Sequence, residues 1–187
     1  MVDILIIGAG ITGSMIAIEL ARYQRTFLVI EKENDVGNVT TNANSAIIHS
    51  GYDPVPNTLK AKLNVLGNKK FDQLAEELDV PFSRSGSLTI ALYDEQLPVL
   101  EELKKRSELN GVEVKLLSKE EVIKLEPNIN PNVKGALFSP TCGSIDPFNL
   151  AVHAMENAVD NGVKLNLEEE VICITNKSEY YLVKTNK

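Results

Sequence analysis

A glycine-rich turn near the start of the sequence constrains the fold more than any other feature. Gly8-Ala9-Gly10-Ile11-Thr12-Gly13 follows an apolar run at residues 3–7, precedes a helix-like stretch at residues 14–23, and is followed by a second apolar run at residues 27–30. Strands that are apolar on both faces belong in a sheet covered by helices, and strand, helix and strand within about 30 residues form a βαβ unit. The sequence therefore predicts the α/β class with a parallel sheet.

The turn is also a candidate dinucleotide site. Glycine lets the backbone turn tightly and lets a pyrophosphate approach the positive end of the following helix. Glu31 ends the second apolar run 18 positions after Gly13, where a carboxylate can bind both hydroxyls of an adenosine ribose. The same carboxylate would repel a ribose 2′-phosphate, which disfavours NADP. These features leave FAD and NAD open, and they equally fit a dinucleotide-binding module without catalysis.

The middle of the chain predicts an inserted part. Leucines at positions 59, 63, 66, 74 and 78 indicate one long amphipathic helix. Glycine inside a helix costs about 1 kcal/mol relative to alanine, so we expect another backbone to pack closely at Gly67. After Pro81, strand-like and helix-like patterns alternate, and Ser118-Lys119-Glu120-Glu121 is a capping box. We expect an α+β lobe that is partly antiparallel.

The last part of the chain is expected to return to the first sheet. Asp146-Pro147 is typical of a helix N-terminus, residues 163–167 predict a third strand of the first sheet, and residues 171–175 and 180–185 predict a hairpin. We therefore expect a discontinuous nucleotide-binding domain at residues 1–80 and 147–187. Residues 81–146 would form part of a substrate domain.

Composition argues against several classes of partner. The chain has 19 basic and 26 acidic residues and a net charge of -7, which disfavours attraction to nucleic acid. The apolar run at residues 4–11 is far too short to span a membrane and follows no basic signal region, so we expect no transmembrane segment and a cytoplasmic location. Two cysteines and two histidines suggest no metal site, and we expect Cys142 and Cys173 to be buried, reduced thiols.

Several further segments resemble one family. They are Asn44-Ser45-Ala46-Ile47-Ile48-His49-Ser50-Gly51-Tyr52, Leu59-Lys60-Ala61-Lys62-Leu63, Gly86-Ser87-Leu88 and Gly143-Ser144-Ile145-Asp146-Pro147. With the glycine turn and Glu31, they make the chain similar to FAD-dependent oxidoreductases of the D-amino acid oxidase type. Within that family, the chain most resembles flavin glycerol-3-phosphate dehydrogenases and L-2-hydroxyglutarate oxidases.

The resemblance implies a Rossmann-like core that binds FAD. In the family the glycine turn holds the pyrophosphate, and the acid ending the second strand holds the ribose. The next polar segment passes the pyrophosphate, ribityl chain and flavin, and a late hairpin meets the adenine through its backbone. Small hydroxyl and amide side chains can hydrogen-bond these groups without crowding them. The implied cofactor-binding residues are Gly8, Gly10, Ile11, Thr12, Gly13, Glu31, Lys32, Thr40, Thr41, Asn44, Ser45, Ala46, Ile48 and Val171.

His49 is the candidate catalytic residue. Hydride transfer from an alcohol requires loss of the hydroxyl proton, which a histidine can accept near neutral pH. The resemblance places His49 at the flavin face. Lys60 and Lys62 follow it closely and are candidates to pair with an anionic substrate. His153 lies off the apolar face of its expected helix, so we expect it to be solvated.

The resemblance implies hydride transfer from a small anionic secondary alcohol, similar to glycerol 3-phosphate, to the flavin. Some glycerol-3-phosphate dehydrogenases have an arginine shortly after the histidine segment, where this chain has Tyr52-Asp53. A 2-hydroxy acid such as L-2-hydroxyglutarate therefore stays open as the substrate, as does an amine or amino acid. The electron acceptor is unknown.

Members of the family are substantially longer than 187 residues. We therefore expect an incomplete, truncated family fold that has little or no activity by itself. An uncovered sheet edge and a half-built cleft would expose apolar surface, which favours self-association.

Overall fold

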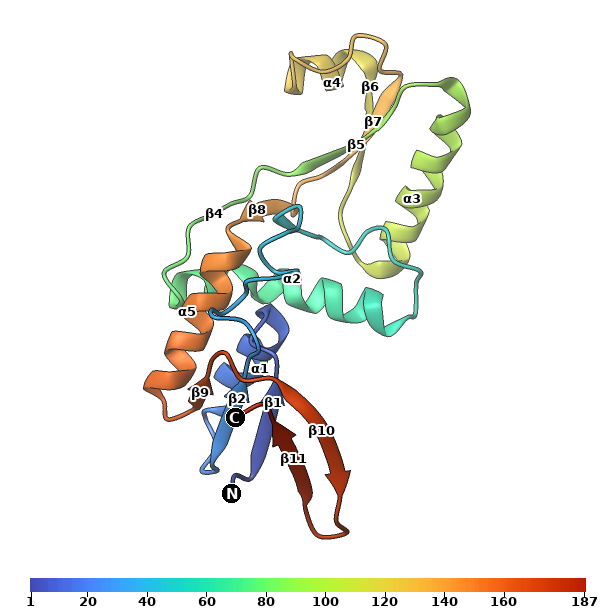
Figure 1. Cartoon of the computed structure of the whole chain (residues 1–187). Helices are drawn as coiled ribbons and strands as arrows, with labels where there is room; N and C mark the ends of the chain where they lie inside the picture. The colour runs from blue at the N-terminus through green and yellow to red at the C-terminus, as the bar shows by residue number, and fades with distance from the viewer. The chain divides into compact units, whose positions relative to one another are not determined.

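The computed structural model describes all 187 residues and separates into two compact units (Figure 1). Unit 1 contains Met1–Ala46, Ala75–Pro81 and Asp146–Lys187, and unit 2 contains Ile47–Leu74 and Phe82–Ile145. Residues 47–74 thus cluster with the inserted part. Compactness does not identify which residues bind a nucleotide, so the division into a nucleotide-binding domain (1–80 and 147–187) and part of a substrate domain (81–146) stays a prediction.

The centre of unit 1 is a parallel three-stranded sheet. Its strands are β1 (Ile4–Ile7), β2 (Phe27–Ile30) and β9 (Lys164–Asn166), in the order β1-β2-β9. Ile4 pairs with Phe27, and Val29 pairs with Leu165. The predicted return of the chain to the first sheet is confirmed.

The two faces of this sheet differ because side chains alternate along a strand. One face buries Ile6, Phe27 and Val29 against two helices, α1 (Ile11–Leu20) and α5 (Pro147–Asp160). Small side chains such as Ala17 and Ala151, both fully buried, belong to the same core. This apolar packing orients α1 on the sheet, and α1 follows directly from the glycine turn.

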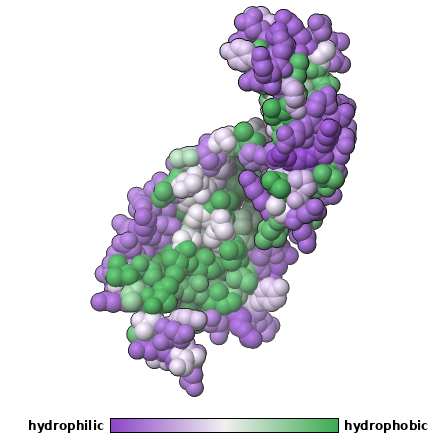
Figure 2. All heavy atoms as spheres, turned by 90° about the vertical axis from the view of Figure 1, so that its right-hand side faces the viewer, coloured by the Kyte–Doolittle hydropathy of each residue, from purple (hydrophilic) through white to green (hydrophobic).

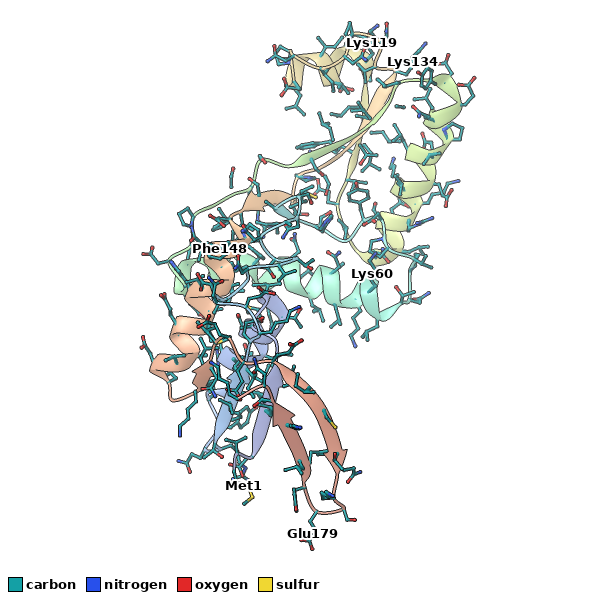
Figure 3. The ribbon with its side chains drawn as sticks, viewed as in Figure 1. Met1, Lys60, Lys119, Lys134, Phe148 and Glu179 are labelled. Carbon is teal, nitrogen blue, oxygen red and sulfur yellow. The ribbon has the colours of Figure 1, made fainter.

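The opposite face of the sheet borders an open apolar groove. Leu5, Ile7 and Leu28 line this groove together with the antiparallel hairpin of β10 (Val171–Asn176) and β11 (Tyr181–Thr185). Ile7 is 53% exposed. Figure 2 shows a broad hydrophobic area on the lower part of the surface, and Figure 3 labels Glu179 in the turn between the two strands.

Helix α5 begins where the sequence predicts. The Asp146 carboxylate accepts hydrogen bonds from the backbone N–H groups of Phe148 and Asn149, at 3.0 and 3.1 Å. Figure 3 shows Phe148 at the start of this helix. The prediction that His153 is solvated is wrong. Its ring is half-buried, and Nδ1 lies 2.6 Å from the carbonyl oxygen of Leu78, a contact that the helical pattern cannot reveal.

Unit 2 contains an antiparallel sheet with a helix on each face. The strands β5 (Ser87–Ala91), β7 (Gly135–Ser139) and β6 (Lys115–Ser118) lie in the order β5-β7-β6. Leu137 packs with α3 (Leu97–Asn110), and its neighbour Ala136 packs on the opposite face with α4 (Lys119–Leu125). A short 3-10 helix, η1 (Asp94–Gln96), precedes α3, and the Ser118 capping box begins α4 as predicted.

A second small sheet in unit 2 was not predicted. It consists of β3 (Ile47–Ile48), β8 (Gly143–Ile145) and β4 (Phe82–Ser83), in the order β3-β8-β4. A Cβ atom on Gly143 would lie 2.2 Å from the Ser83 carbonyl oxygen, so this close pairing requires glycine. Strands of two or three residues carry too little periodicity to be recognised in a sequence.

The long helix α2 (Leu59–Glu77) is confirmed, but its predicted packing is wrong. A Cβ atom on Gly67 would have no neighbour within 4 Å, so no backbone packs closely there. Leu59, Leu63 and Leu66 are 69%, 55% and 45% exposed. Helical spacing therefore predicted the helix, whereas the apolar stripe on its first half is largely exposed.

The two thiols differ in accessibility. Cys142 is 2% exposed, as expected, whereas Cys173 is exposed on β10, contrary to the sequence prediction. Alternation on a hairpin gives no measure of how well each face is covered. None of the helices has both the length and the apolar character needed to cross a membrane.

This difference predicts selective alkylation. Iodoacetamide should modify Cys173 in the folded protein, because the exposed thiol is accessible to the reagent. Cys142 should react only after denaturation. Peptide mass spectrometry with and without guanidinium checks this, and rapid labelling of Cys142 in the native protein would contradict the structure.

Candidate cofactor and substrate sites

The glycine turn is built on close backbone contact. A Cβ atom on Gly13 would lie 1.9 Å from the Gly8 carbonyl oxygen, so only glycine fits at this position. Gly8 has a φ of 98°, a value that favours glycine, and its N–H donates to the Ile30 carbonyl at 2.8 Å. The turn therefore brings the ends of β1 and β2 together at the start of α1.

The start of α1 has free backbone donors. The first N–H groups of a helix have no intrahelical acceptor, and the N-cap residue Gly10 has no side chain to satisfy them. Thr41 Oγ1 accepts the Ile11 N–H at 3.0 Å, and the Ser14 N–H bonds back to Gly10 at 3.0 Å. The N–H groups of Thr12 and Gly13 remain at the positive end of the helix, with no acidic side chain in the first turn. This arrangement fits a pyrophosphate.

Glu31 is held against the same turn. Its side chain is nearly buried, with Oε2 accepting the Ala9 N–H at 2.7 Å and Oε1 accepting the Glu33 N–H at 2.9 Å. An ionised carboxylate has about four lone-pair sites, so two hydroxyl donors can still bind. Lys32 is exposed, and its Nζ lies 3.7 Å from Glu33 Oε1. The carboxylate of Glu31 thus suits a ribose beside the pyrophosphate position.

The polar segment at residues 40–46 folds onto the glycine turn through Thr41. The Thr41 side chain is buried, and its carbonyl accepts a bond from Asn44 Nδ2 at 2.6 Å. Asn44 Oδ1 accepts the Ala46 N–H at 2.7 Å, and Ala46 adopts a φ of 56°. Thr40 and Ser45 are exposed. The Asn44 amide therefore fixes the turn from within, and the hydroxyls of Thr40 and Ser45 are exposed on it.

The other candidate residues lie in different places. Val171 is the first residue of β10 and is half-buried in unit 1. Ile48 is buried in β3 of unit 2, and His49 follows it, exposed and with no hydrogen bond to its imidazole. Lys60 and Lys62 are exposed at the start of α2 without an ion pair, and Figure 3 labels Lys60 there. The turn, Glu31 and Thr41 are thus brought together in unit 1, whereas His49 and the lysines belong to unit 2.

The two arginines of unit 2 are engaged within the fold. Arg84 bonds to Asp72 and to the carbonyls of Asn68 and Thr141. Arg106 bonds to Glu102 and to the Asp53 carbonyl, at 2.6 and 2.8 Å. Sequence reasoning missed both roles, since the partner carbonyls are distant in the chain. In unit 2 the lysines of α2 are therefore better placed than arginine to pair with an anion.

A polar cluster lies directly beside His49 in the chain. The hydroxyls of Ser50 and Ser139 are both buried and 2.8 Å apart, and Cys142 lies next to them. Burial raises the pKa of the Cys142 thiol, but hydrogen bonds from Ser50, Ser87 and Ser139 outweigh burial and hold the pKa below its ordinary value. Ser50 is thereby anchored in the interior of unit 2.

The glycine turn, the buried acid and the parallel sheet define a dinucleotide-binding fold, and the comparisons with known proteins give its family. The sequence matches the DAO family, described as FAD dependent oxidoreductase, over residues 3–186. The chain belongs to this family, and its cofactor is FAD.

Particular relatives carry the comparison further. The chain is 52% identical over 188 residues to a glycerol 3-phosphate dehydrogenase of Caloramator mitchellensis, covering all of this chain and 39% of that protein. It is 32% identical to an L-2-hydroxyglutarate dehydrogenase of Arabidopsis thaliana, covering 85% of this chain and 33% of that protein. A solved L-alpha-glycerophosphate oxidase of Mycoplasma pneumoniae with FAD bound superimposes with a TM-score of 0.93 at 34% identity, covering 99% of this chain and 50% of that one. The chain thus spans half or less of the length of each of these proteins.

The close contact at the glycine turn generates a matched pair of variants. Gly13→Ala should abolish FAD uptake, because its Cβ would collide with the Gly8 carbonyl and displace the helix donors. Gly67→Ala, in the open interior of α2, should leave FAD uptake unchanged and stabilise the protein by about 0.5–1 kcal/mol. Flavin fluorescence titration and thermal unfolding check both variants. Undiminished FAD uptake by Gly13→Ala would show that the turn does not hold the cofactor.

Proposed function

We propose that the chain supplies the FAD-binding part of a flavoenzyme that oxidises glycerol 3-phosphate. The observation that carries this proposal is the 52% identity to a glycerol 3-phosphate dehydrogenase over the entire chain. The geometry of the glycine turn and Glu31 agrees with it. When bound, FAD supplies the hydride acceptor, and the protein supplies binding, orientation and proton transfer.

Unit 1 would hold most of the cofactor. The N–H groups at the start of α1 would bind the pyrophosphate, with Gly8, Gly10 and Gly13 allowing its approach. Glu31 would bind the adenosine ribose, Lys32 would lie beside it, and the backbone of Val171 would meet the adenine. The remaining proposed contacts along the pyrophosphate, ribityl chain and flavin are Ile11, Thr12, Thr40, Thr41, Asn44, Ser45, Ala46 and Ile48.

Unit 2 would provide the groups that act on the substrate. The His49 imidazole is exposed and free of hydrogen bonds, so it is available to accept the hydroxyl proton of an alcohol. Lys60 and Lys62 are exposed and unpaired, so either is available to bind a phosphate or carboxylate. We propose His49 as the general base and the two lysines as substrate-binding residues.

A second candidate substrate is a 2-hydroxy acid. The similarity to an L-2-hydroxyglutarate dehydrogenase favours it, and so does the absence of an arginine at Tyr52-Asp53. Glycerol 3-phosphate and L-2-hydroxyglutarate are both small anionic secondary alcohols, so the same histidine and lysines could serve either. We also propose that the protein is cytoplasmic and that it passes electrons from the reduced flavin to a separate acceptor.

A chimera tests the activity. Residues 1–187 would replace the matching segment of the Caloramator mitchellensis protein, and flavin bleaching would be followed anaerobically with glycerol 3-phosphate, L-2-hydroxyglutarate or glycine. We expect glycerol 3-phosphate to bleach the flavin fastest, and the 187-residue chain alone to show little turnover. His49→Gln should lower the bleaching rate by about 10²–10⁴, the usual contribution of a general base. His153→Gln is the matched control and should keep the rate.

Different results would redirect the proposal. Faster bleaching with L-2-hydroxyglutarate would favour the 2-hydroxy acid. A chimera that binds FAD but is bleached by none of the three compounds would contradict the enzyme assignment and favour a binding module.

We also propose that the 187-residue chain self-associates. Ile7 exposes an apolar side chain at the open face of the sheet. Burial of this side chain against a second copy of the chain would remove apolar surface from water. Sedimentation velocity should show a weight-average mass that rises with concentration, and Ile7→Thr should reduce the rise. The control Ile123→Thr, on α4 in unit 2, should not. A monomer at every concentration would contradict this proposal.

A further inference from the structure

The six residues that follow β3 are held by side chains from elsewhere in unit 2. We call residues 49–54 the His49 loop. It has no regular secondary structure, yet each of its residues makes a hydrogen bond to a residue distant in the sequence. The pairs are His49 O with Asn68, Ser50 Oγ with Ser139, Gly51 O with Asn110, Tyr52 OH with Thr89, Asp53 O with Arg106, and Pro54 O with Asn110.

The His49 imidazole is an exception within this loop. The backbone of His49 is held, whereas its ring is exposed and makes no hydrogen bond. The held backbone therefore fixes the position of the His49 Cα and the direction of its Cα–Cβ bond. A loop fixed at every residue, with one free imidazole, is suited to present that imidazole to a reacting group.

Asn68 holds the carbonyl of His49 itself. From the middle of α2, its Nδ2 donates to the His49 carbonyl at 2.9 Å and to the Thr141 carbonyl at 2.9 Å. Two carbonyl oxygens require donors, so the amide orientation is determined, and both of its hydrogens are used. A carboxylate at this position would face two acceptors and could make neither bond.

These two bonds extend the β3–β8 pairing. The ladder pairs Ile47 with Ser144 and Ile48 with Gly143, and no backbone pair follows it. Asn68 connects the two backbone segments just beyond the end of this ladder, where its amide donates to the His49 and Thr141 carbonyls. The backbone of His49 is thus fixed by the ladder on one side and by Asn68 on the other.

Asn68 is itself held by Arg84. Arg84 Nη2 donates to the Asn68 carbonyl at 3.0 Å, and Nη1 donates to the Thr141 carbonyl. The guanidinium lies over the rings of Phe71 and Phe82, 5.7 and 6.0 Å from their centroids. Arg84 therefore limits movement of the Asn68 backbone and of the Thr141 carbonyl, which together define the position of the Asn68 amide.

We propose that Asn68 is a positioning residue for His49. By tying the His49 carbonyl to that of Thr141, it sets the direction of the His49 Cα–Cβ bond, from which the imidazole extends. The role of the imidazole as a base rests on the proposed function, whereas the tether is a property of the folded chain and can be tested without a substrate.

Asn110 provides a matched comparison. It also donates its Nδ2 to two carbonyls of the His49 loop, those of Gly51 and Pro54, at 3.0 and 2.9 Å. Both asparagines are half-buried helix residues with the same bonding pattern. Asn68 acts on the residue that carries the imidazole, whereas Asn110 acts further along the loop. A general structural role would make the two equivalent.

The chain has two histidines, so the ring signals of His49 and His153 can be assigned by NMR with a His49→Gln reference. Asn68→Asp keeps the shape and removes both donors. We expect it to shift and broaden the His49 ring signals and to speed amide exchange of Ser50 roughly tenfold, as for a lost hydrogen bond. The His153 signals, which report on unit 1, should stay unchanged. Asn110→Asp should leave the His49 ring signals in place.

A measurement on the unaltered protein covers the case in which Asn68→Asp does not fold. A scalar coupling across the hydrogen bond should connect Asn68 Nδ2 with the carbonyl carbon of His49. Absence of this coupling would overturn the proposal, and so would unchanged His49 ring signals in a folded Asn68→Asp variant. An equal effect of Asn110→Asp on the ring would overturn it as well. None of these readouts depends on turnover. An inactive chimera would therefore contradict the proposed function and leave the proposed role of Asn68 unaffected.

Discussion

The close contact between Gly8 and Gly13 is the constraint on which unit 1 depends. Residue 13 is a glycine and has no Cβ, so the Gly8 carbonyl can occupy the space where a Cβ would lie. This close approach lets β1 pass directly into α1. The Ala9 N–H of the same turn then reaches the carboxylate of Glu31 at 2.7 Å. One backbone turn thus places the helix donors and the buried acid together at the carboxyl ends of β1 and β2, where a dinucleotide can bind both.

The structure assigns the candidate groups to separate units. Unit 1 carries the helix donors and the acid that we propose bind FAD, while unit 2 carries His49 on a loop with a long-range hydrogen bond at each of its residues. Such a division is physically reasonable, since a bound flavin supplies redox chemistry and a protein supplies orientation and proton transfer. The family match covers residues 3–186 and so includes both units.

Features with a local physical cause could be predicted from the sequence. Apolar runs predicted β1 and β2, helical spacing predicted α2, and a cap followed by proline predicted the start of α5 at Asp146. Glu31 could be found because a βαβ unit fixes the distance from the glycine turn to the end of the second strand. In each case a few neighbouring residues carry the signal.

Features that depend on distant contacts could not be predicted. Asn68 lies in an ordinary helical pattern, and its bond to Thr141 joins residues 73 positions apart. The openness around Gly67 and the bond between His153 and Leu78 likewise depend on what packs nearby. No spacing rule reports on such neighbours, so the β3-β8-β4 sheet and the tethers of the His49 loop appear in the structure alone.

The central claim is that this chain by itself builds an FAD site from the glycine turn and Glu31. The most direct test is the absorbance spectrum of the purified 187-residue protein after incubation with FAD and gel filtration, with the nucleotide released on denaturation identified by mass. A protein that carries this site should be yellow and should release FAD. A protein that stays colourless after this treatment would contradict the claim, whether or not it retains NAD.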